Sequence, residues 1–415
     1  MATLNKFRKI LKVLGPGLIT GASDDDPSGI ATYSQAGAQS GMRNLWLAVF
    51  TLPLMAAIQG MCARIGIVTS EGLTVSLKRH YPRPVLYLML LFSLPAITLN
   101  IGADLQGMGA VAHMIFPQVP AVLFTVVITI VLMYTIIKFP YQKIAAVLKW
   151  LCVSLLLYLI VPFLVHQDWR SVLIHTIRPT ITFDKSSMAI VVAMLGTTIS
   201  PYLFFWQATM EAEDMKHGKG KIIVDKLILT DMRKDVNAGM ILSCMVMFFM
   251  TLTAGSVLFP AGIRQIDTIE QAAKALEPLA GRLTYLLFAT GVMGTGFLAI
   301  PVLAGSQSYM LAETFGWEEG LDKTFTQAKP FYISIIVSLV IGVSLDALGI
   351  SPVKALLYTA ILYGLTAPVL IAIILHIGNN KKIMGAYTNS LLSNVLGVIT
   401  LLIMTAAAVG LLYTM

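Results

Sequence analysis

The sequence predicts an all-helical polytopic membrane protein with eleven transmembrane helices. Hydrophobic residues make up 57% of the chain and charged residues only 12%, whereas soluble domains carry about 25% charged residues. The apolar segments are about 20 residues long, which is the length a helix needs to cross a bilayer, and short polar connections separate them. The expected spans are about 10–38, 44–68, 84–109, 119–138, 144–166, 188–212, 238–260, 283–312, 331–349, 353–377 and 390–413.

Two of these spans, the first and the sixth, are interrupted by proline and small polar residues. The first contains three consecutive aspartates directly before Pro27, and the sixth carries hydroxylated residues before Pro201. Proline removes a backbone donor, so a helix kinks or breaks there. One proline in a membrane helix is usually only a kink. Paired interruptions in the two halves of a chain, however, predict an inverted-repeat transporter with its site at the membrane midplane.

One transmembrane domain is expected to take up the whole chain, residues 1–415. The first repeat would cover about 10–166 and the second about 188–377, with an extra helix at about 390–413. Because each repeat has five spans, an odd number, the second repeat enters the membrane with the opposite orientation. The predicted architecture is therefore a 5+5 inverted repeat with broken helices 1 and 6.

Positive charges predict the orientation of the chain. With a cytoplasmic N-terminus, 21 of the 29 Lys and Arg residues lie on the cytoplasmic side, as the positive-inside rule requires. We therefore expect the N-terminus inside and the C-terminus outside, in a plasma membrane of the bacterial inner-membrane type. The net charge of +8 follows from this topology and requires no nucleic-acid partner. No cleavable signal peptide is expected at the N-terminus.

The aspartates of the first span predict a cation site. Ionised carboxylates persist in a bilayer only where they face water, a partner or a cation. Pro27 and Gly29 weaken the helix directly after Asp26. We therefore expect an unwound segment whose free carbonyls and carboxylates point at one spot, and that spot would bind a cation.

Several short motifs resemble one family of membrane proteins. They are Gly15-Pro-Gly17, Asp26-Pro-Ser-Gly-Ile-Ala-Thr-Tyr-Ser-Gln-Ala-Gly-Ala-Gln39, Arg64-Ile-Gly-Ile-Val-Thr69, Asp104-Leu105 and the stretch from Gly196 to Leu203. Together they resemble the NRAMP divalent-metal transporter family over nearly the whole chain. The resemblance implies an amino-acid–sodium symporter-like fold and divalent-metal import. It also implies that Asp26 is the metal-binding aspartate and that Asp104 matches a residue assigned to proton movement.

The departures from the family pattern resemble a divergent branch, the NRAMP-related magnesium transporters. Gly29 stands where the family has an asparagine, and Ser200 stands where it has a metal-binding methionine. Tyr202 and Gln207 replace histidines, and Gly107 replaces a glutamate. The first-span motif is kept, so these departures bear on which ion is transported and not on the fold.

The chemistry of these residues also favours a hard cation. A thioether selects soft transition metals, whereas oxygen ligands suit Mg²⁺, which is usually held by one or two carboxylates and keeps several waters. The expected ligands are the Asp26 carboxylate, the Ser200 hydroxyl and backbone carbonyls near Ser23 and Thr197. Loss of the asparagine side chain at Gly29 leaves room for a partly hydrated ion. The alternative for Ser200 is packing or a hydrogen bond to a backbone carbonyl.

Four further polar residues are expected along the ion's path or around its waters. Asp24 and Asp25 either raise the negative potential and hold water, or cap the unwound turn. Tyr202 and Gln207 are likewise expected along the ion's path or around its waters. Because Tyr202 and Gln207 stand in place of histidines, the chain lacks two side chains that could transfer protons along the path. Histidine is the side chain best suited to proton transfer near neutral pH.

Two polar residues of the third span, Asn100 and Asp104, each have two interpretations. Asp104 either serves proton movement or is a carboxylate satisfied by neighbouring hydroxyls. Asn100 either lines a path or makes an interhelical hydrogen bond. The sequence does not decide between these roles.

The sequence thus predicts import of divalent metal ions by alternating access, with Mg²⁺ preferred, Mn²⁺ accepted and no proton coupling. The ion is the substrate, no cofactor is expected, and the protein is expected to be a monomer in the lipid bilayer. One alternative is a proton-coupled Mn²⁺ or Fe²⁺ importer of the main NRAMP type. Another is a sodium-coupled organic-solute symporter of the same fold, whose anionic substrate the aspartates would repel. An enzyme is not expected, because the spans contain no nucleophile–base pair.

Overall fold

The computed structural model describes residues 15–140, 143, 159–165, 167–217, 224–281, 284–345 and 349–414, and in these ranges it contains helices and connecting loops but no strand. Eight helices or joined helix pairs in this part of the chain are long and apolar enough to cross a membrane. They are α4 (Leu45–Thr69), α6 (Arg83–Ile115), α7 (Ala121–Lys138), α11 (Lys185–Thr198) with α12 (Pro201–His217), α13 (Lys226–Val257), α16 (Thr284–Phe315), α18 (Pro352–Asn379) and α20 (Leu391–Thr414).

The remaining expected spans have different outcomes. The first is the pair α2 (Pro16–Asp24) and α3 (Pro27–Ser40), and the ninth is the shorter helix α17 (Lys329–Ser344). The fifth, expected at 144–166, lies mostly outside the described residues. The division into two repeats stays a prediction.

Short helices connect the spans. They are α5 (Leu73–His80), α9 (Val161–Leu164), α10 (Trp169–Ile177), α14 (Ile269–Ala273), the 3₁₀ helix η2 (Lys274–Leu276), α15 (Glu277–Ala280) and α19 (Lys381–Met384). Helix α13 starts well before residue 238, where the seventh span was expected. Its start is fixed by Asp225, whose side chain accepts a hydrogen bond from the backbone N–H of Ile228 at 2.8 Å, a standard helix cap.

Both predicted helix breaks are present. Asp25 ends α2 with φ −87° and ψ 52°, and Asp26 is extended with φ −69° and ψ 175°. The second break follows Ile199, and α12 then starts at Pro201. In each case a proline occupies the first helical position. An N–H at this position has no partner within the helix, so the proline costs no helical hydrogen bond.

The broken helices pack directly on unbroken ones. Helix α2 contacts α13 so closely that a Cβ atom on Gly21 would lie 2.2 Å from the carbonyl oxygen of Gly239. Helix α11 contacts α18 in the same way, because a Cβ on Gly196 would lie 2.1 Å from the carbonyl oxygen of Ala360. Small residues allow membrane helices to approach at this distance. Each break is therefore held in place by a continuous helix.

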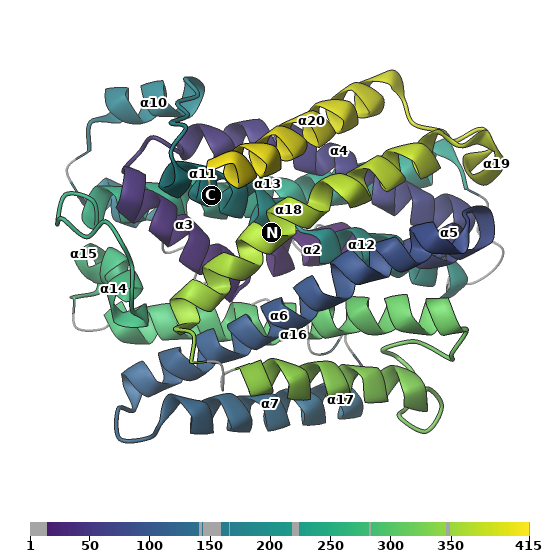
Figure 1. The fold of residues 1–415 in the computed structure, drawn as a ribbon, viewed down its shortest axis with the longest axis horizontal. Helices are drawn as coiled ribbons and strands as arrows, with labels where there is room; N and C mark the ends of the chain where they lie inside the picture. Colours follow the sequence, from purple (N-terminus) through teal and green to yellow (C-terminus); the bar gives the residue numbers. More distant parts are fainter. Residues whose placement is uncertain are drawn as a thin grey trace, which may run out of the picture.

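The long helices surround the breaks in layers. Helix α13 packs on α2, α3 and α4, while α6 packs on α16 and α18. In Figure 1, α7 and α17 run side by side along one edge of the molecule, outside α6 and α16. Helix α20 runs along the opposite edge, against α18 and α11. The two breaks thus lie in the interior of the bundle.

Candidate metal centre

The two helix breaks meet in space. The hydroxyl of Tyr202, at the start of α12, donates a hydrogen bond of 2.8 Å to the carbonyl oxygen of Ser23, near the end of α2. Tyr33 of α3 and Thr198 of α11 are joined by a hydrogen bond of 3.3 Å between their hydroxyls. All four residues are buried. Segments 165 and 179 residues apart in sequence therefore form one site, as expected of helices broken at the membrane midplane.

Asp26 is held from two sides. Its Oδ1 accepts a hydrogen bond from the backbone N–H of Gly29 at 2.8 Å, which caps α3. Its Oδ2 accepts from the Asn100 side chain of α6 at 2.9 Å. The Asn100 Oδ1 in turn accepts from the hydroxyl of Thr359 of α18 at 3.0 Å. Three helices thus fix this carboxylate, which is only 2% exposed.

Asn100 therefore belongs to the site. The sequence left it as a path residue or an interhelical hydrogen-bonding residue, and the structure shows the hydrogen bond. A usable signal was its spacing from Asp104, because residues four apart lie on the same face of a helix. Thr359, by contrast, carries no signal in the sequence.

Asp24 and Asp26 are hydrogen-bonded to different helices, and the expectation that all three carboxylates point at one spot stays a prediction. Asp24 Oδ2 accepts a hydrogen bond of 2.5 Å from the Ser243 hydroxyl of α13. The chain leaves the helical conformation at Asp25, and Asp26 after it is extended. In the described part of the chain, no three His, Cys, Asp or Glu side chains form a group that could hold a metal ion.

Several buried oxygens of the site lack a protein partner. One carboxylate oxygen each of Asp24 and Asp25 and the Ser23 hydroxyl are buried without a hydrogen bond. Within the described ranges, no lysine or arginine forms an ion pair with these carboxylates. Buried charges need a partner, and a bound cation with its waters would supply one.

Ser200 uses its hydroxyl locally in this structure. Its Oγ donates towards the carbonyl oxygens of Thr197 at 2.5 Å and Gly196 at 3.2 Å. This is the backbone hydrogen bond expected as the alternative to ligation. The lone pairs of Oγ remain available, so ligation by Ser200 stays a prediction.

The other predicted ligands are placed as follows. The Ser23 carbonyl accepts from Tyr202, and the Thr197 carbonyl accepts from Ser200, so both lie at the meeting point of the breaks. A Cβ on Gly29 would lie 3.5 Å from the Thr197 hydroxyl and 3.3 Å from the Asp24 carbonyl oxygen. A larger side chain at position 29 would therefore fill the space between the two breaks.

Gln207 lies further along α12. Its Nε2 donates a hydrogen bond of 2.9 Å to Glu211, and its Oε1 is buried without a partner. No hydrogen bond joins it to Asp26. A role along the ion's path stays a prediction for Gln207, and so does the role of Tyr202 beyond its bond to Ser23.

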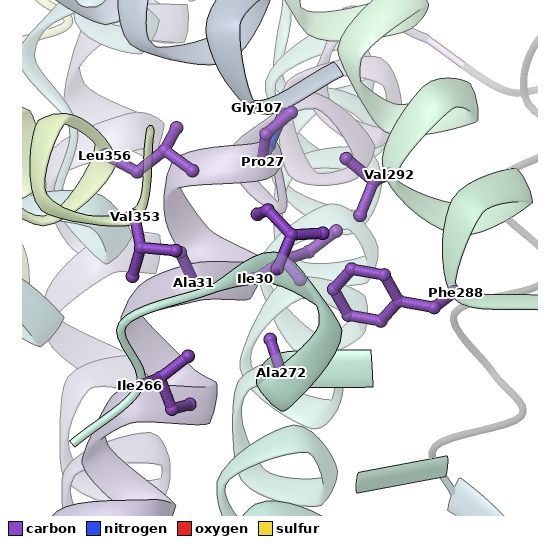
Figure 2. A pocket seen from close by; sticks show the side chains of 11 residues that line it. Pro27, Ile30, Ala31, Gly107, Ile266, Ala272, Phe288, Val292, Val353 and Leu356 are labelled. Atoms are coloured by element: carbon purple, nitrogen blue, oxygen red, sulfur yellow. The ribbon is translucent and has the colours of Figure 1, made fainter. Parts of the chain in front are cut away.

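A small apolar pocket lies beside the site. Figure 2 shows Pro27 and Gly107 at one end of it and Ile266 and Ala272 at the other, with Phe288 at the side. A Cβ on Gly107 would lie 3.2 Å from a methyl carbon of Leu356, which also lines the pocket. A glutamate at position 107 would put a charge here. The glycine keeps the pocket apolar.

Comparison with known proteins decides the family. A family model described as natural resistance-associated macrophage protein-like (Nramp) matches residues 17–414, which is nearly the whole chain. The chain belongs to the Nramp family. This confirms the resemblance found in the sequence.

Curated relatives cover almost the full length of this Nramp protein. A divalent metal cation transporter MntH of Caldanaerobacter subterraneus subsp. tengcongensis is 26% identical over 400 residues, covering 95% of this chain and 91% of the relative. An MntH of Clostridium acetobutylicum is 25% identical over 411 residues, covering 98% and 92%. The two relatives carry the same name, and each is matched over more than nine-tenths of its length.

Solved structures show the same fold. A manganese transporter of Eremococcus coleocola in complex with an aromatic bis-isothiourea substituted compound matches with a TM-score of 0.78 at 16% identity, over 98% of this chain and 87% of that one. The inward-facing conformation of Mhp1 matches with a TM-score of 0.54 at 12% identity, over 97% and 89%. The predicted fold class, a helical transporter of the amino-acid–sodium symporter type, is thereby confirmed. The protein is a multi-pass membrane transporter.

Proposed function

We propose that this Nramp protein imports divalent metal ions by alternating access, with Mg²⁺ preferred and Mn²⁺ accepted. The names of the relatives support the divalent class. The preference for Mg²⁺ rests on the site itself. Asp26 carries the proposal, because it is a carboxylate fixed by three helices at the meeting point of the two helix breaks.

The ligand atoms around Asp26 support a hard ion. They are carboxylate, hydroxyl and carbonyl oxygens from Asp26, Ser200, Ser23 and Thr197. Oxygen ligands in a site with one carboxylate suit Mg²⁺, which keeps several of its waters. Gly29 contributes by leaving the space between the breaks free of a side chain.

The second candidate is a proton-coupled importer of Mn²⁺ or Fe²⁺. One observation favours it besides the names of the relatives. The thioether sulfur of Met247 accepts a hydrogen bond of 3.4 Å from Thr198, at the end of α11. A sulfur this close to the break is the kind of ligand that favours softer metals.

The proposal also holds that transport is not coupled to protons. Positions 202 and 207 carry Tyr and Gln, so no histidine stands there to transfer protons near neutral pH. Buried carboxylates remain as groups that can bind protons, so transport of protons must be measured directly.

Thermal stabilisation tests the class of substrate. A ligand that binds only the folded protein raises its melting temperature by mass action. We expect millimolar Mg²⁺ to stabilise the detergent-solubilised protein and Mn²⁺ to do so as well. Asp26→Ala should remove the effect, whereas Asp231→Ala, at an exposed ion pair with Lys234, should keep it. Stabilisation by Na⁺ with small organic solutes and not by divalent ions would instead favour an organic-solute symporter.

The remaining assignments are part of the same proposal. The N-terminus is cytoplasmic and the C-terminus is outside, as the distribution of Lys and Arg predicts. The substrate is the ion and the environment is the bilayer. We propose a monomer, with no resident cofactor, no catalytic activity and no nucleic-acid partner.

A further inference from the structure

Arg64 of α4 is a buried cation away from the metal centre. The residue is 8% exposed, and its hydrogen bond in the described part of the chain runs from Nη2 to Oδ1 of Asn389, a neutral amide. Its Nε atom is buried without a hydrogen-bond partner, and none of the ion pairs within the described ranges includes Arg64. A buried charge is costly unless an opposite charge accompanies it. Arg64 is therefore expected to take an anion from outside the chain.

A second arginine increases the need for an anion. Arg233 of α13 lies close enough to Arg64 to repel it, and no acidic side chain offsets this repulsion. The aspartates next to Arg233 on α13 are used elsewhere: Asp231 is paired with Lys234, and Asp235 accepts hydrogen bonds from the backbone at the start of α2. Arg233 is exposed, so an anion can reach the two guanidinium groups from outside.

The segment between α19 and α20 borders Arg64 with neutral groups. Asn389 is fixed by a hydrogen bond of 2.9 Å from its Nδ2 to Oδ1 of Asn394, so its own Oδ1 is presented to Arg64. An amide oxygen accepts a hydrogen bond but brings no charge. The hydroxyl of Tyr387 donates a hydrogen bond of 2.7 Å to the carbonyl oxygen of Val224. The segments before α13 and before α20 are thus joined beside the two arginines.

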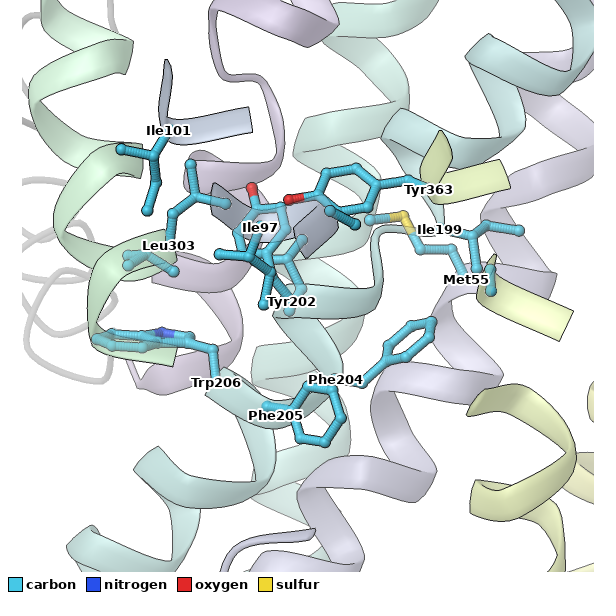
Figure 3. Packing of buried hydrophobic residues seen from close by; sticks show 14 of the residues in the cluster. Met55, Ile97, Ile101, Ile199, Tyr202, Phe204, Phe205, Trp206, Leu303 and Tyr363 are labelled. Atoms are coloured by element: carbon cyan, nitrogen blue, oxygen red, sulfur yellow. The ribbon is translucent and has the colours of Figure 1, made fainter. Parts of the chain in front are cut away.

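Helix α4 places Arg64 near the surface of the membrane. Figure 3 shows Met55 of α4 among buried apolar side chains, and Arg64 lies further along, five residues before the helix ends at Thr69. The 25 residues of α4 span about 37 Å at about 1.5 Å per residue, compared with about 30 Å for the hydrocarbon core of a bilayer. Arg64 is therefore within about one turn of the headgroup layer. The predicted orientation makes this the cytoplasmic leaflet, which carries anionic lipids.

We propose that Arg64 and Arg233 together bind a phosphate group where α4, α13 and the segment before α20 meet. A guanidinium carries five N–H donors in a planar fork that matches phosphate oxygens, and Nε of Arg64 is free to donate. Lys381 and Lys382 of α19, a helix that contacts α4, add positive charge nearby. The headgroup of an anionic phospholipid and free phosphate share this chemistry, and the position at the headgroup layer favours the lipid. The site does not depend on which ion is transported.

Melting temperature against lipid concentration tests the site in delipidated protein. A ligand that binds only the folded state raises the melting temperature, and we expect phosphatidylglycerol to do so more than phosphatidylcholine. Arg64→Gln should raise the half-maximal concentration of phosphatidylglycerol about tenfold, because charge-assisted hydrogen bonds are lost. Arg233→Gln, at an exposed position, should raise it about threefold. Arg79→Gln is the control, because Arg79 is an exposed arginine paired with Glu71. An unchanged response to phosphatidylglycerol in Arg64→Gln and Arg233→Gln would overturn the proposal.

Asn389→Asp provides a second test with the opposite sign. It puts a carboxylate beside Arg64 and removes only a neutral hydrogen bond to Asn394, which is weaker than a charge-assisted one. We expect the lipid-free variant to melt at a higher temperature than the lipid-free wild type, and phosphatidylglycerol to stabilise it less than half as much. Ser390→Asp adds the same charge at the next, exposed position and should do neither. A lipid-free Asn389→Asp that melts lower and keeps the full lipid response would show that Arg64 does not lack an anion.

The same titrations, repeated with inorganic phosphate, identify the source of the phosphate group. Stabilisation by phosphatidylglycerol but not by inorganic phosphate, with the lipid effect lost in Arg64→Gln, would support a lipid headgroup. Stabilisation by inorganic phosphate that Arg64→Gln also removes would support the phosphate site and assign it to a soluble ligand. If neither anion produces a response that depends on Arg64, the proposal is wrong, whatever ion the protein transports.

Discussion

At the scale of residues, Asp26 is the best-fixed polar group of the site. Its importance was visible in the sequence, because an aspartate before a proline in an apolar span is costly unless it is used. Its partners were not visible. Asn100 lies 74 residues away and Thr359 lies 259 residues beyond Asn100. Which polar groups meet across helices depends on packing, and one sequence does not show it.

The partners of Asp24 and Asp26 were not predictable for a second reason. Asp24 is hydrogen-bonded to Ser243 and Asp26 to Asn100, and the helix ends at Asp25 between them. Composition gives the charge of such a segment. It does not give the path of the backbone through it.

Asn100→Ala should weaken metal binding. A hydrogen bond to a charged group contributes about 1.5–3 kcal/mol, and each 1.4 kcal/mol is about tenfold in affinity, so the Kd should rise about tenfold or more. Thr359→Val removes only the neutral hydrogen bond behind Asn100 and should have a smaller effect. Isothermal titration with Mg²⁺ and Mn²⁺ would check both. Unchanged affinity in Asn100→Ala would mean that Asp26 does not depend on this chain of hydrogen bonds.

Glu319, in the connection between α16 and α17, should make stability depend on pH. Burial raises its pKa to about 7, with Glu213 adding to the rise and Lys216 and Lys323 opposing it. Because this pKa is higher in the folded protein than in the unfolded chain, the carboxyl takes up protons on folding. The free energy of unfolding therefore falls as pH rises from about 4.5 through 7. We expect Glu319→Gln to flatten the decline in melting temperature between pH 5 and 8.

The adjacent residue supplies the control for this prediction. The hydrogen bond from Lys323 to the exposed Glu318 lowers the pKa of Glu318. Glu318 is also the weakest of the charges that act on Glu319, so Glu318→Gln should leave most of the decline in melting temperature in place. A wild-type melting temperature that does not fall between pH 5 and 8 would contradict the role of Glu319.

At the scale of elements, the helix breaks are the part of the fold that the sequence predicts best. Pro27 and Pro201 act locally, because a proline cannot donate a hydrogen bond wherever the rest of the chain goes. The start of α13 was harder to predict, since Asp225 caps a helix that begins in the polar segment before residue 238, where the seventh span was expected. A local cap decided that boundary and hydropathy did not.

Gly21→Ala should separate α2 from α13. The added methyl group would lie 2.2 Å from the Gly239 carbonyl oxygen, so one helix has to move, at a cost of about 1–3 kcal/mol. We expect a lower melting temperature and weaker metal binding, because α2 leads directly into the site.

Gly60→Ala is the control for this change. A Cβ on Gly60 of α4 meets nothing within 4 Å, and alanine is the better helix former by about 1 kcal/mol. This variant should be as stable as the wild type or more so. A Gly21→Ala variant with the stability of Gly60→Ala would show that the close contact of α2 and α13 is not needed.

At the scale of the whole molecule, hydropathy and paired breaks were enough to predict the fold class, and the structural matches confirm it. They do not identify the ion, because proteins of one fold carry different substrates. The ion depends on a few atoms around Asp26 and Ser200. The positions of these atoms follow from the contact between the two breaks, which lie far apart in the sequence.

Transport into proteoliposomes tests the central claim most directly. Purified wild type and Asp26→Ala would be compared for Mg²⁺ influx, with a pH-sensitive dye inside the same vesicles. We predict Mg²⁺ influx by the wild type without acidification of the interior, and no influx by Asp26→Ala. Uptake of Mn²⁺ but not Mg²⁺, with acidification in proportion to uptake, would contradict the account and identify a proton-coupled importer of softer metals.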